Sequence, residues 1–176
     1  TVKAPAQLPY IEMAYHAPAL REPETDWEPY ALEMLAGVLD GNESARLNKV
    51  LVREQRVASA AGASYDSTTR GPAAFYLDGT PSEGKTVADV EAALRVEIEK
   101  LLRDGVTEEE LARIKAQVVA GHVFQLDSMF FQAMQIGQLE SIGLSYRDVD
   151  TILRKLQAVT AEQVRDVAKK YLKDDN

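Results

Sequence analysis

Hydrophobic residues in the first part of the chain follow two periods, which predict one strand and two helices. Residues 8–16, LPYIEMAYH, alternate in part and contain Tyr and Ile, so they predict a strand. After a loop with two prolines, residues 27–38 repeat apolar side chains at helical spacing. Asp26 is the candidate N-cap of this helix, and Gly41 ends it. Residues 44–54 repeat the helical period with basic side chains on the other side, and predict a short amphipathic helix.

A β-hairpin is expected next. Residues 57–67 are small, apolar and partly alternating, and residues 73–80 form a second apolar run. The intervening TTRGP is a turn signal, because Gly and Pro interrupt regular structure. The two runs therefore predict paired strands.

The second half of the chain keeps a helical period almost throughout. Thr107 with Glu110 has the spacing of a capping box, in which each side chain bonds the other residue's backbone N–H. Thr160 with Gln163 repeats this spacing, and Gly105 marks the end of the preceding helix. The predicted helices cover residues 87–103, 111–142, 145–156 and 160–172.

The longest predicted helix, residues 111–142, contains two unusual features. Gly121 and Gly137 lie inside it and are candidate bends. A stripe of large apolar side chains also runs along it, made of Phe124, Met129, Phe130, Phe131 and Met134. We interpret this stripe as the face that the helix buries in the core, with a ligand groove as the alternative.

The order of elements predicts an α+β fold with an antiparallel sheet packed on one side by helices. A chain of 176 residues suits one domain or at most two, and can bury a sizeable core. We expect a single domain over residues 1–176, cut from a longer protein.

Composition excludes several classes of function. The net charge is -8, which argues against nucleic acid as a partner because phosphate binding needs clustered Lys and Arg. The chain has no cysteine, so disulfides, thiolate zinc sites and a cysteine nucleophile are excluded. No stretch approaches the roughly 20 apolar residues of a membrane span.

The residues alone display no active centre. The chain has two histidines, His16 and His122, and neither lies in an H-x-x-E-H or H-E-x-x-H zinc motif. A metal site built from both is the less favoured alternative to two structural or surface histidines. Phosphate-binding loops and the Gly-x-Ser-x-Gly motif do not occur. The glutamates of residues 108–110 suit a helix N-terminus better than acid–base catalysis.

Two stretches resemble the second domain of the insulinase/pitrilysin family of zinc peptidases. The first is YALEMLAGVLDGNESARL followed by VREQRVASAAGASYD. The family pattern there is an apolar helix, a glycine-rich break, Ser-Ser-Arg-Leu, then a helix ending in Arg-Glu-Glu-Lys-Gly-Leu-Ala-Tyr and a strand. Residues 44–47, SARL, match with one serine replaced. DGVTEEELARIKAQV, the long helix and the C-terminal SYRDVDTILRKLQAVTAEQVRDVAKKYL also fit, so the likeness runs from about residue 8 onward.

This family includes the mitochondrial processing peptidase and the core proteins of the bc1 complex. The resemblance implies two homologous α+β domains in each half of a clamshell that encloses an unfolded peptide. The first domain would carry zinc on H-x-x-E-H, with the glutamate activating water. Because this chain lacks the motif, it is similar to the second, non-zinc domain, and we expect no metal ligand and no cofactor on it.

Active members also use an Arg and, seven positions later, a Tyr from the second type of domain to hold the substrate carbonyl. Laying REQRVASA on this pattern places Arg53 at the Arg and Ala60 at the Tyr. Ala60 has no hydroxyl, and Tyr65 lies five positions further on, so no catalytic residue is expected here. Arg53 is a candidate substrate contact, with a solvated helix charge as the alternative.

The resemblance thus predicts a non-catalytic domain that forms part of the wall of a peptide-enclosing chamber and packs on a zinc-bearing domain. Its partners would be that domain, a homologous partner subunit and an unfolded peptide. A catalytically dead structural or assembly homologue is the alternative, and an unrelated binding module is a third hypothesis. Bacterial relatives are often exported, so a periplasmic protein is allowed, although no signal peptide is visible in the sequence.

Overall fold

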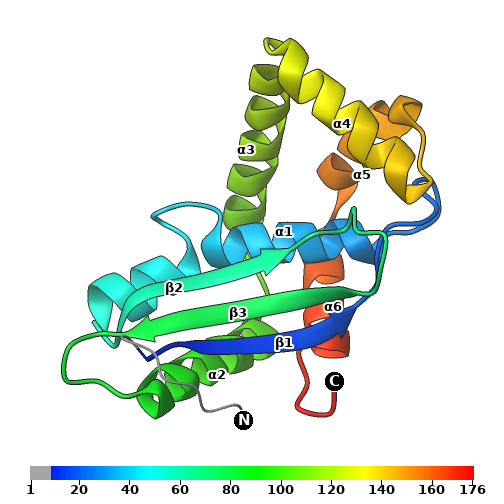
Figure 1. Ribbon diagram of the computed structural model, residues 1–176. Helices are drawn as coiled ribbons and strands as arrows, with labels where there is room; N and C mark the ends of the chain where they lie inside the picture. Colours follow the sequence, from blue (N-terminus) through cyan, green and yellow to red (C-terminus); the bar gives the residue numbers. More distant parts are fainter. Residues whose placement is uncertain (1–8) are drawn as a thin grey trace.

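The computed structural model describes residues 9–176, except for the side chains of residues 125 and 126. Its centre is an antiparallel sheet of strands β1 (Ile11–Ala17), β2 (Ala58–Tyr65) and β3 (Ala73–Pro81) in the order β1-β3-β2 (Figure 1). Strands β2 and β3 are the predicted hairpin, and β1 pairs with the other edge of β3. Residue 8, where the first strand was predicted to begin, lies outside the described residues.

One face of the sheet is covered and the other is open. Tyr15, Phe75 and Leu77 are buried on the covered face, while Ala14, Tyr76 and other alternate residues are exposed on the opposite face. The covering helices are α1 (Glu28–Asp40), α2 (Val87–Asp104) and α6 (Ala161–Tyr171), which lie behind the sheet in Figure 1. This arrangement confirms the predicted α+β class with helices on one side.

Helix α1 is the central element of the core because its apolar residues recur all along one side. Tyr30, Leu35 and Leu39 are almost completely buried there. The prediction that Asp26 caps this helix is wrong. The helix begins after Trp27 without a side-chain cap, and the Asp26 carboxylate accepts instead from the backbone N–H groups of Arg21 and Glu22. The backbone N–H groups of the preceding loop bind this carboxylate, so it is not available to cap the helix.

The short helix after α1 is wider than an α-helix. Element η1 (Asn48–Glu54) is a π-helix in which Leu51 is buried, and it ends near Arg56, whose φ is 52°. Such segments are rare and lie frequently at functional sites. The sequence pattern predicted the helix here but not its type, because the apolar side is too short to define a period.

Side-chain caps define most of the remaining helix starts. Thr107 and Glu110 form the predicted capping box at the start of α3 (Glu108–Leu126). Thr160 and Gln163 form the second predicted box at α6, and Thr86 makes a further box at α2. The remaining C-terminal elements are η2 (Tyr146–Asp148) and α5 (Val149–Ala158).

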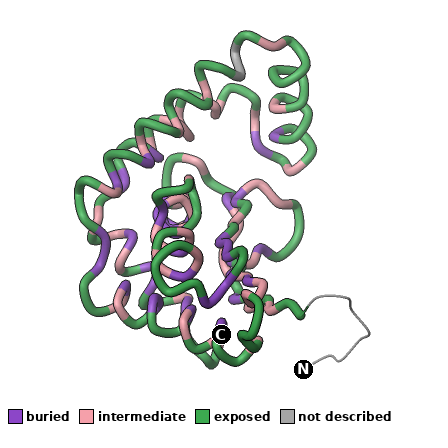
Figure 2. The backbone as a smooth tube through the Cα atoms, turned by 90° about the vertical axis from the view of Figure 1, so that its left-hand side faces the viewer, coloured by how far each residue is buried: buried purple, intermediate pink, exposed green. Residues whose placement is uncertain are grey.

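The prediction of one continuous helix over residues 111–142 is wrong. The chain turns at residues 127–128, and α4 (Met129–Ile142) returns from there with Ser128 as its N-cap. Neither Gly121 nor Gly137 breaks a helix. Figure 2 shows that the outer end of this α3–α4 hairpin is mostly exposed, whereas buried residues concentrate near the sheet. Among the described residues, no helix combines the length and apolarity needed to cross a membrane.

The predicted core role of the Phe/Met stripe is also wrong. All five of its side chains are at least half exposed, from Phe131 at 51% to Met129 at 87%. The turn at residues 127–128 carries α4 away from the sheet, so the stripe has no core to face.

Candidate functional site

The first candidate site is the end of η1, where sequence matching placed Arg53. Its side chain is exposed in the last turn of η1, and Nη2 donates to the Glu43 carbonyl at 2.7 Å. The guanidinium therefore ties η1 to the preceding turn. An arginine carries five N–H donors, so this contact leaves others available for a ligand.

Ala60 lies nearby on β2 and is exposed beside Thr80 of β3. It brings no hydroxyl to this end of the sheet. Tyr65, the nearest tyrosine along the strand, directs its hydroxyl to the Pro18 carbonyl, and burial raises its pKa. Tyr65 therefore has a structural role and does not replace a catalytic tyrosine near Arg53.

Arg53 borders a broad open depression of about 960 Å³ in which opposite charges balance. Besides Arg53, its charged lining residues are Arg46, Lys49, Lys100 and Arg113 with Glu54, Glu97, Asp104, Glu109 and Glu110. Lys100 pairs with Glu97 at 2.6 Å. Because most of these charges can neutralise one another, the depression offers no strong field to a charged ligand.

Arg46, the arginine of the SARL segment, is a structural clamp. Its Nε and Nη2 each lie 2.7 Å from a carboxylate oxygen of Glu110, and Nη2 also donates to the Gly105 carbonyl at 2.9 Å. Burial alone would raise the pKa of Glu110, but hydrogen bonds from Arg46 and Thr107 outweigh it and lower this pKa to about 2. Through Arg46, the SARL segment thus joins the turn after α1 to the start of α3.

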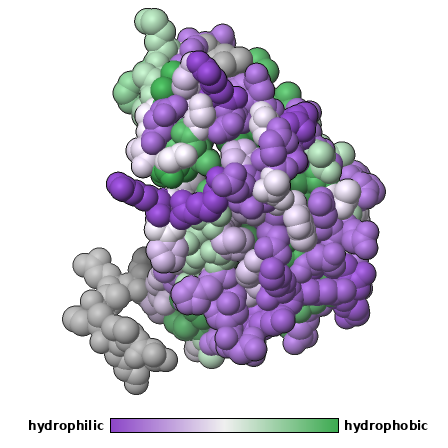
Figure 3. All heavy atoms as spheres, turned by 90° about the vertical axis from the view of Figure 1, so that its right-hand side faces the viewer, coloured by the Kyte–Doolittle hydropathy of each residue, from purple (hydrophilic) through white to green (hydrophobic). Residues whose placement is uncertain are grey.

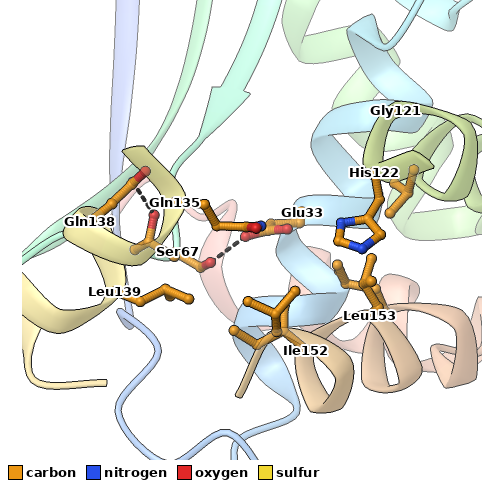
Figure 4. Close-up of a pocket in the computed structure, with 13 residues that line it drawn as sticks. Glu33, Ser67, Gly121, His122, Gln135, Gln138, Leu139, Ile152 and Leu153 are labelled. Atoms are coloured by element: carbon orange, nitrogen blue, oxygen red, sulfur yellow. Dashed lines mark hydrogen bonds between the residues drawn. The ribbon is translucent and has the colours of Figure 1, made fainter. Parts of the chain in front are cut away.

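A second candidate site is a pocket of about 440 Å³ between α1, α3, α4 and α5 (Figure 4). Apolar side chains make about half of its wall, namely Val118, Leu139, Val149, Ile152, Leu153 and Leu156. Glu33 lies at its base and accepts a hydrogen bond from the Ser67 hydroxyl, while Gln138 donates to Thr68 at 2.6 Å. The pocket has the size and composition typical of small-molecule sites.

Burial raises the pKa of Glu33, and the hydrogen bond from Ser67 works against that rise. Ser67 is 2% exposed and its carbonyl accepts from the Leu20 N–H at 2.9 Å, so the carboxylate anchors the β2–β3 connection to α1. Sequence reasoning missed this pair. The only available signal was an acidic residue at an apolar position of α1.

The two histidines lie on different elements of the fold. His122 points into the pocket near Glu33, whereas His16 lies on β1, where its carbonyl accepts from Asn176. Among the described residues, no group of three or more His, Cys, Asp and Glu side chains could hold a metal ion.

Comparison with known proteins identifies the chain. Residues 1–118 match the family model described as "Peptidase M16 inactive domain".

The chain belongs to the peptidase M16 family.

An uncharacterized zinc protease of Mycobacterium tuberculosis is 30% identical to this M16 chain over 167 residues. The alignment covers 92% of the chain and 36% of the relative. The M16 chain thus spans about a third of the length of the curated relative that it matches.

Solved structures agree on the fold. A protease from Helicobacter pylori superimposes with a TM-score of 0.85 at 20% identity, over 96% of this chain and 40% of that one. The inactive peptidase domain of a candidate zinc protease from Bordetella parapertussis superimposes with a TM-score of 0.83 at 19% identity. The match covers 100% of this chain and 92% of that one. The resemblance to the insulinase/pitrilysin peptidases is therefore confirmed, and this chain is an inactive M16 domain of the kind found in zinc proteases.

Proposed function

We propose that this domain supplies part of the wall of a peptide-enclosing chamber and packs on a zinc-bearing domain that breaks the peptide bond. The observation that carries this proposal is the open face of the sheet. Helices cover the opposite face, so the open face is available to line a cavity formed with another domain. Family membership supplies the expected zinc-bearing partner.

The open face suits an extended polypeptide. Across its centre, Ala14, Tyr76 and Ser64 lie side by side on β1, β3 and β2, and all three are exposed. Small side chains on either side of one aromatic ring leave room for a peptide that varies in sequence. Glu12 and Asp78 form the next pair along the sheet and add negative charge to the wall.

Arg53 is the candidate substrate contact within this proposal. It is exposed at the edge of the depression near the start of β2, and its recorded bond to the Glu43 carbonyl engages one nitrogen. Substrate carbonyl groups would accept from the remaining donors. Ala60 contributes no polar group to that contact, so the chemistry belongs to the zinc-bearing domain.

The decisive experiment uses the intact parent protein. Ser64→Trp places a bulky ring on the open face, and we expect it to raise KM for an unfolded peptide while zinc content stays unchanged. Val96→Trp is the matched control, because Val96 is an exposed apolar residue on α2, outside the sheet. Equal KM values for both variants and the wild type would contradict the proposal.

The structural alternative makes a different prediction for the same protein. A catalytically dead homologue would hold no zinc and cleave no peptide before any substitution is made. Zinc analysis and peptide hydrolysis on the unmodified parent, alone and with a homologous partner, separate the two functions.

A further inference from the structure

The pocket between α1, α3, α4 and α5 holds one carboxylate, that of Glu33, among apolar side chains. Glu33 is partly exposed, and about half of the other residues that line the pocket are apolar. Figure 4 shows the carboxylate among the side chains of Gln135, His122 and Ile152. All of these walls come from this chain, and figures that show the outer surface, such as Figure 3, do not bear on them.

This carboxylate has no basic partner among the described residues. No Lys or Arg lines the pocket. Burial raises the pKa of Glu33, the charge of Asp66 raises it further, and only hydrogen bonds from Ser67 lower it. Burying an ionised carboxylate is costly unless an opposite charge accompanies it. The pocket therefore favours a ligand that brings a positive charge.

Two further polar side chains of the pocket are available to a ligand. Among the described residues, neither Gln135 nor His122 has a hydrogen bond or an ion pair, although both line the pocket. An amide and an imidazole can each donate to or accept from a bound molecule. Gln138 differs from them because its amide already donates to Thr68 at 2.6 Å.

The wall contributed by α3 has a gap at Gly121. A β-carbon at this position would meet nothing within 4 Å, so no neighbouring side chain occupies the space beside it. The pocket volume of about 440 Å³ lies in the range of sites that hold small organic molecules. A ligand therefore has both room and an entry beside α3.

We propose that this pocket binds an organic ammonium ion with an apolar body. The Ser67 hydroxyl donates to Oε1 of Glu33, so the ammonium group would donate to Oε2. Charge-assisted hydrogen bonds of this kind are stronger than neutral ones. The apolar body would pack against Ile152, Leu153 and Val149 of the wall. An anion would be repelled by Glu33 and by the net charge of -8.

This site is separate from the proposed chamber wall. None of the residues that line it belongs to a strand, and none is shared with the depression beside Arg53. Binding of the ammonium ion requires neither zinc nor peptide. A failure of this proposal would leave the proposed function standing, and the reverse also holds.

Isothermal titration calorimetry of the intact parent protein with phenylbutylammonium chloride tests the proposal. We expect saturable binding of one ion per chain. Phenylbutanol has the same apolar body without the charge and should bind at least about tenfold more weakly, while phenylbutanoate should not bind. A thermal unfolding midpoint that rises with the concentration of phenylbutylammonium provides a second measurement.

Two substitutions place the ion in this pocket. Glu33→Gln keeps an acceptor for Ser67 but removes the charge, and should weaken binding by roughly tenfold or more. Gly121→Leu fills the gap in α3 while Glu33 remains, and should abolish binding. Gly137→Leu is the matched control, because a β-carbon there also meets nothing within 4 Å and Gly137 does not line the pocket. Its affinity should equal that of the wild type.

Circular dichroism establishes which variants are folded, and Gly121→Leu decides the matter if Glu33→Gln does not fold. Equal affinity for the ammonium ion and the alcohol would overturn the proposal. Wild-type affinity in a folded Glu33→Gln or Gly121→Leu variant would do the same. A parent protein without saturable binding, including one in which another of its segments fills the pocket, would also overturn it.

Discussion

At the scale of single residues, a charged side chain within the family motif stabilises the fold. Arg46 binds Glu110 through two nitrogens and also bonds the Gly105 carbonyl, so one guanidinium joins three segments. Bidentate arginine–carboxylate pairs are the stronger class of ion pair. The matching of SARL by sequence located this residue but could not assign its partner, which lies sixty-four positions away.

The Glu110 carboxylate should make stability depend on acid pH. Its pKa in the fold is about 2, against 4.5 when free, so its stabilising contribution is complete above pH 4.5 and disappears as pH falls toward 2. Urea unfolding at a series of pH values should therefore show Glu110→Gln less stable than wild type at neutral pH, with the difference shrinking below pH 4.5.

Glu109→Gln is the control for this measurement, because Glu109 is exposed in the same turn of α3. Its difference from wild type should not vary across the same pH range. A constant difference for Glu110→Gln as well would show that Arg46 does not stabilise the ionised carboxylate.

At the scale of elements, local signals located the helix ends while the three-dimensional environment decided helix length. The boxes at Thr107 and Thr160 need only residues three apart, so the sequence predicts them well. The turn at residues 127–128 was missed because apolar residues continue on both sides of it. A helical period indicates local conformation. It does not distinguish one continuous helix from two helices that form a hairpin.

The connection between α2 and α3 should tolerate no side chain at Gly105. This residue has φ 74° and ψ -155°, a conformation confined essentially to glycine. We expect Gly105→Ala to lower the free energy of unfolding by about 1–3 kcal/mol. Gly71→Ala is the control, since a β-carbon there meets nothing within 4 Å and no positive φ is recorded. Equal midpoints of urea unfolding for the two variants would contradict this prediction.

At the scale of the whole molecule, the arrangement of the sheet and helices bears on the function proposed above. Its sheet has a covered and an open face, and among the described residues no side-chain group is arranged to bind a metal. A zinc protease is similar to this chain over about a third of its own length, and the function proposed above places the metal on another domain. The α3–α4 hairpin carries several large apolar side chains that are exposed in this chain.

The chain by itself should therefore bind no stoichiometric zinc and cleave no unfolded peptide. Metal analysis after dialysis and a fluorogenic peptide assay check this expectation. The informative contrary result is one zinc per chain that is lost in His122→Ala or His16→Ala, since that would place a metal site on this domain.

Sequence alone determined the class of fold, most of the order of its elements, the capping boxes at Thr107 and Thr160 and the family, because each depends on neighbouring residues or on a pattern along the chain. Only the tertiary structure decided that Glu33 meets Ser67, that Arg46 clamps Glu110 and that the Phe/Met stripe is exposed. These facts depend on which surfaces meet in space. A hydrophobic period shows that a helix has an apolar side, but the partner of that side is chosen by the whole fold or by another molecule.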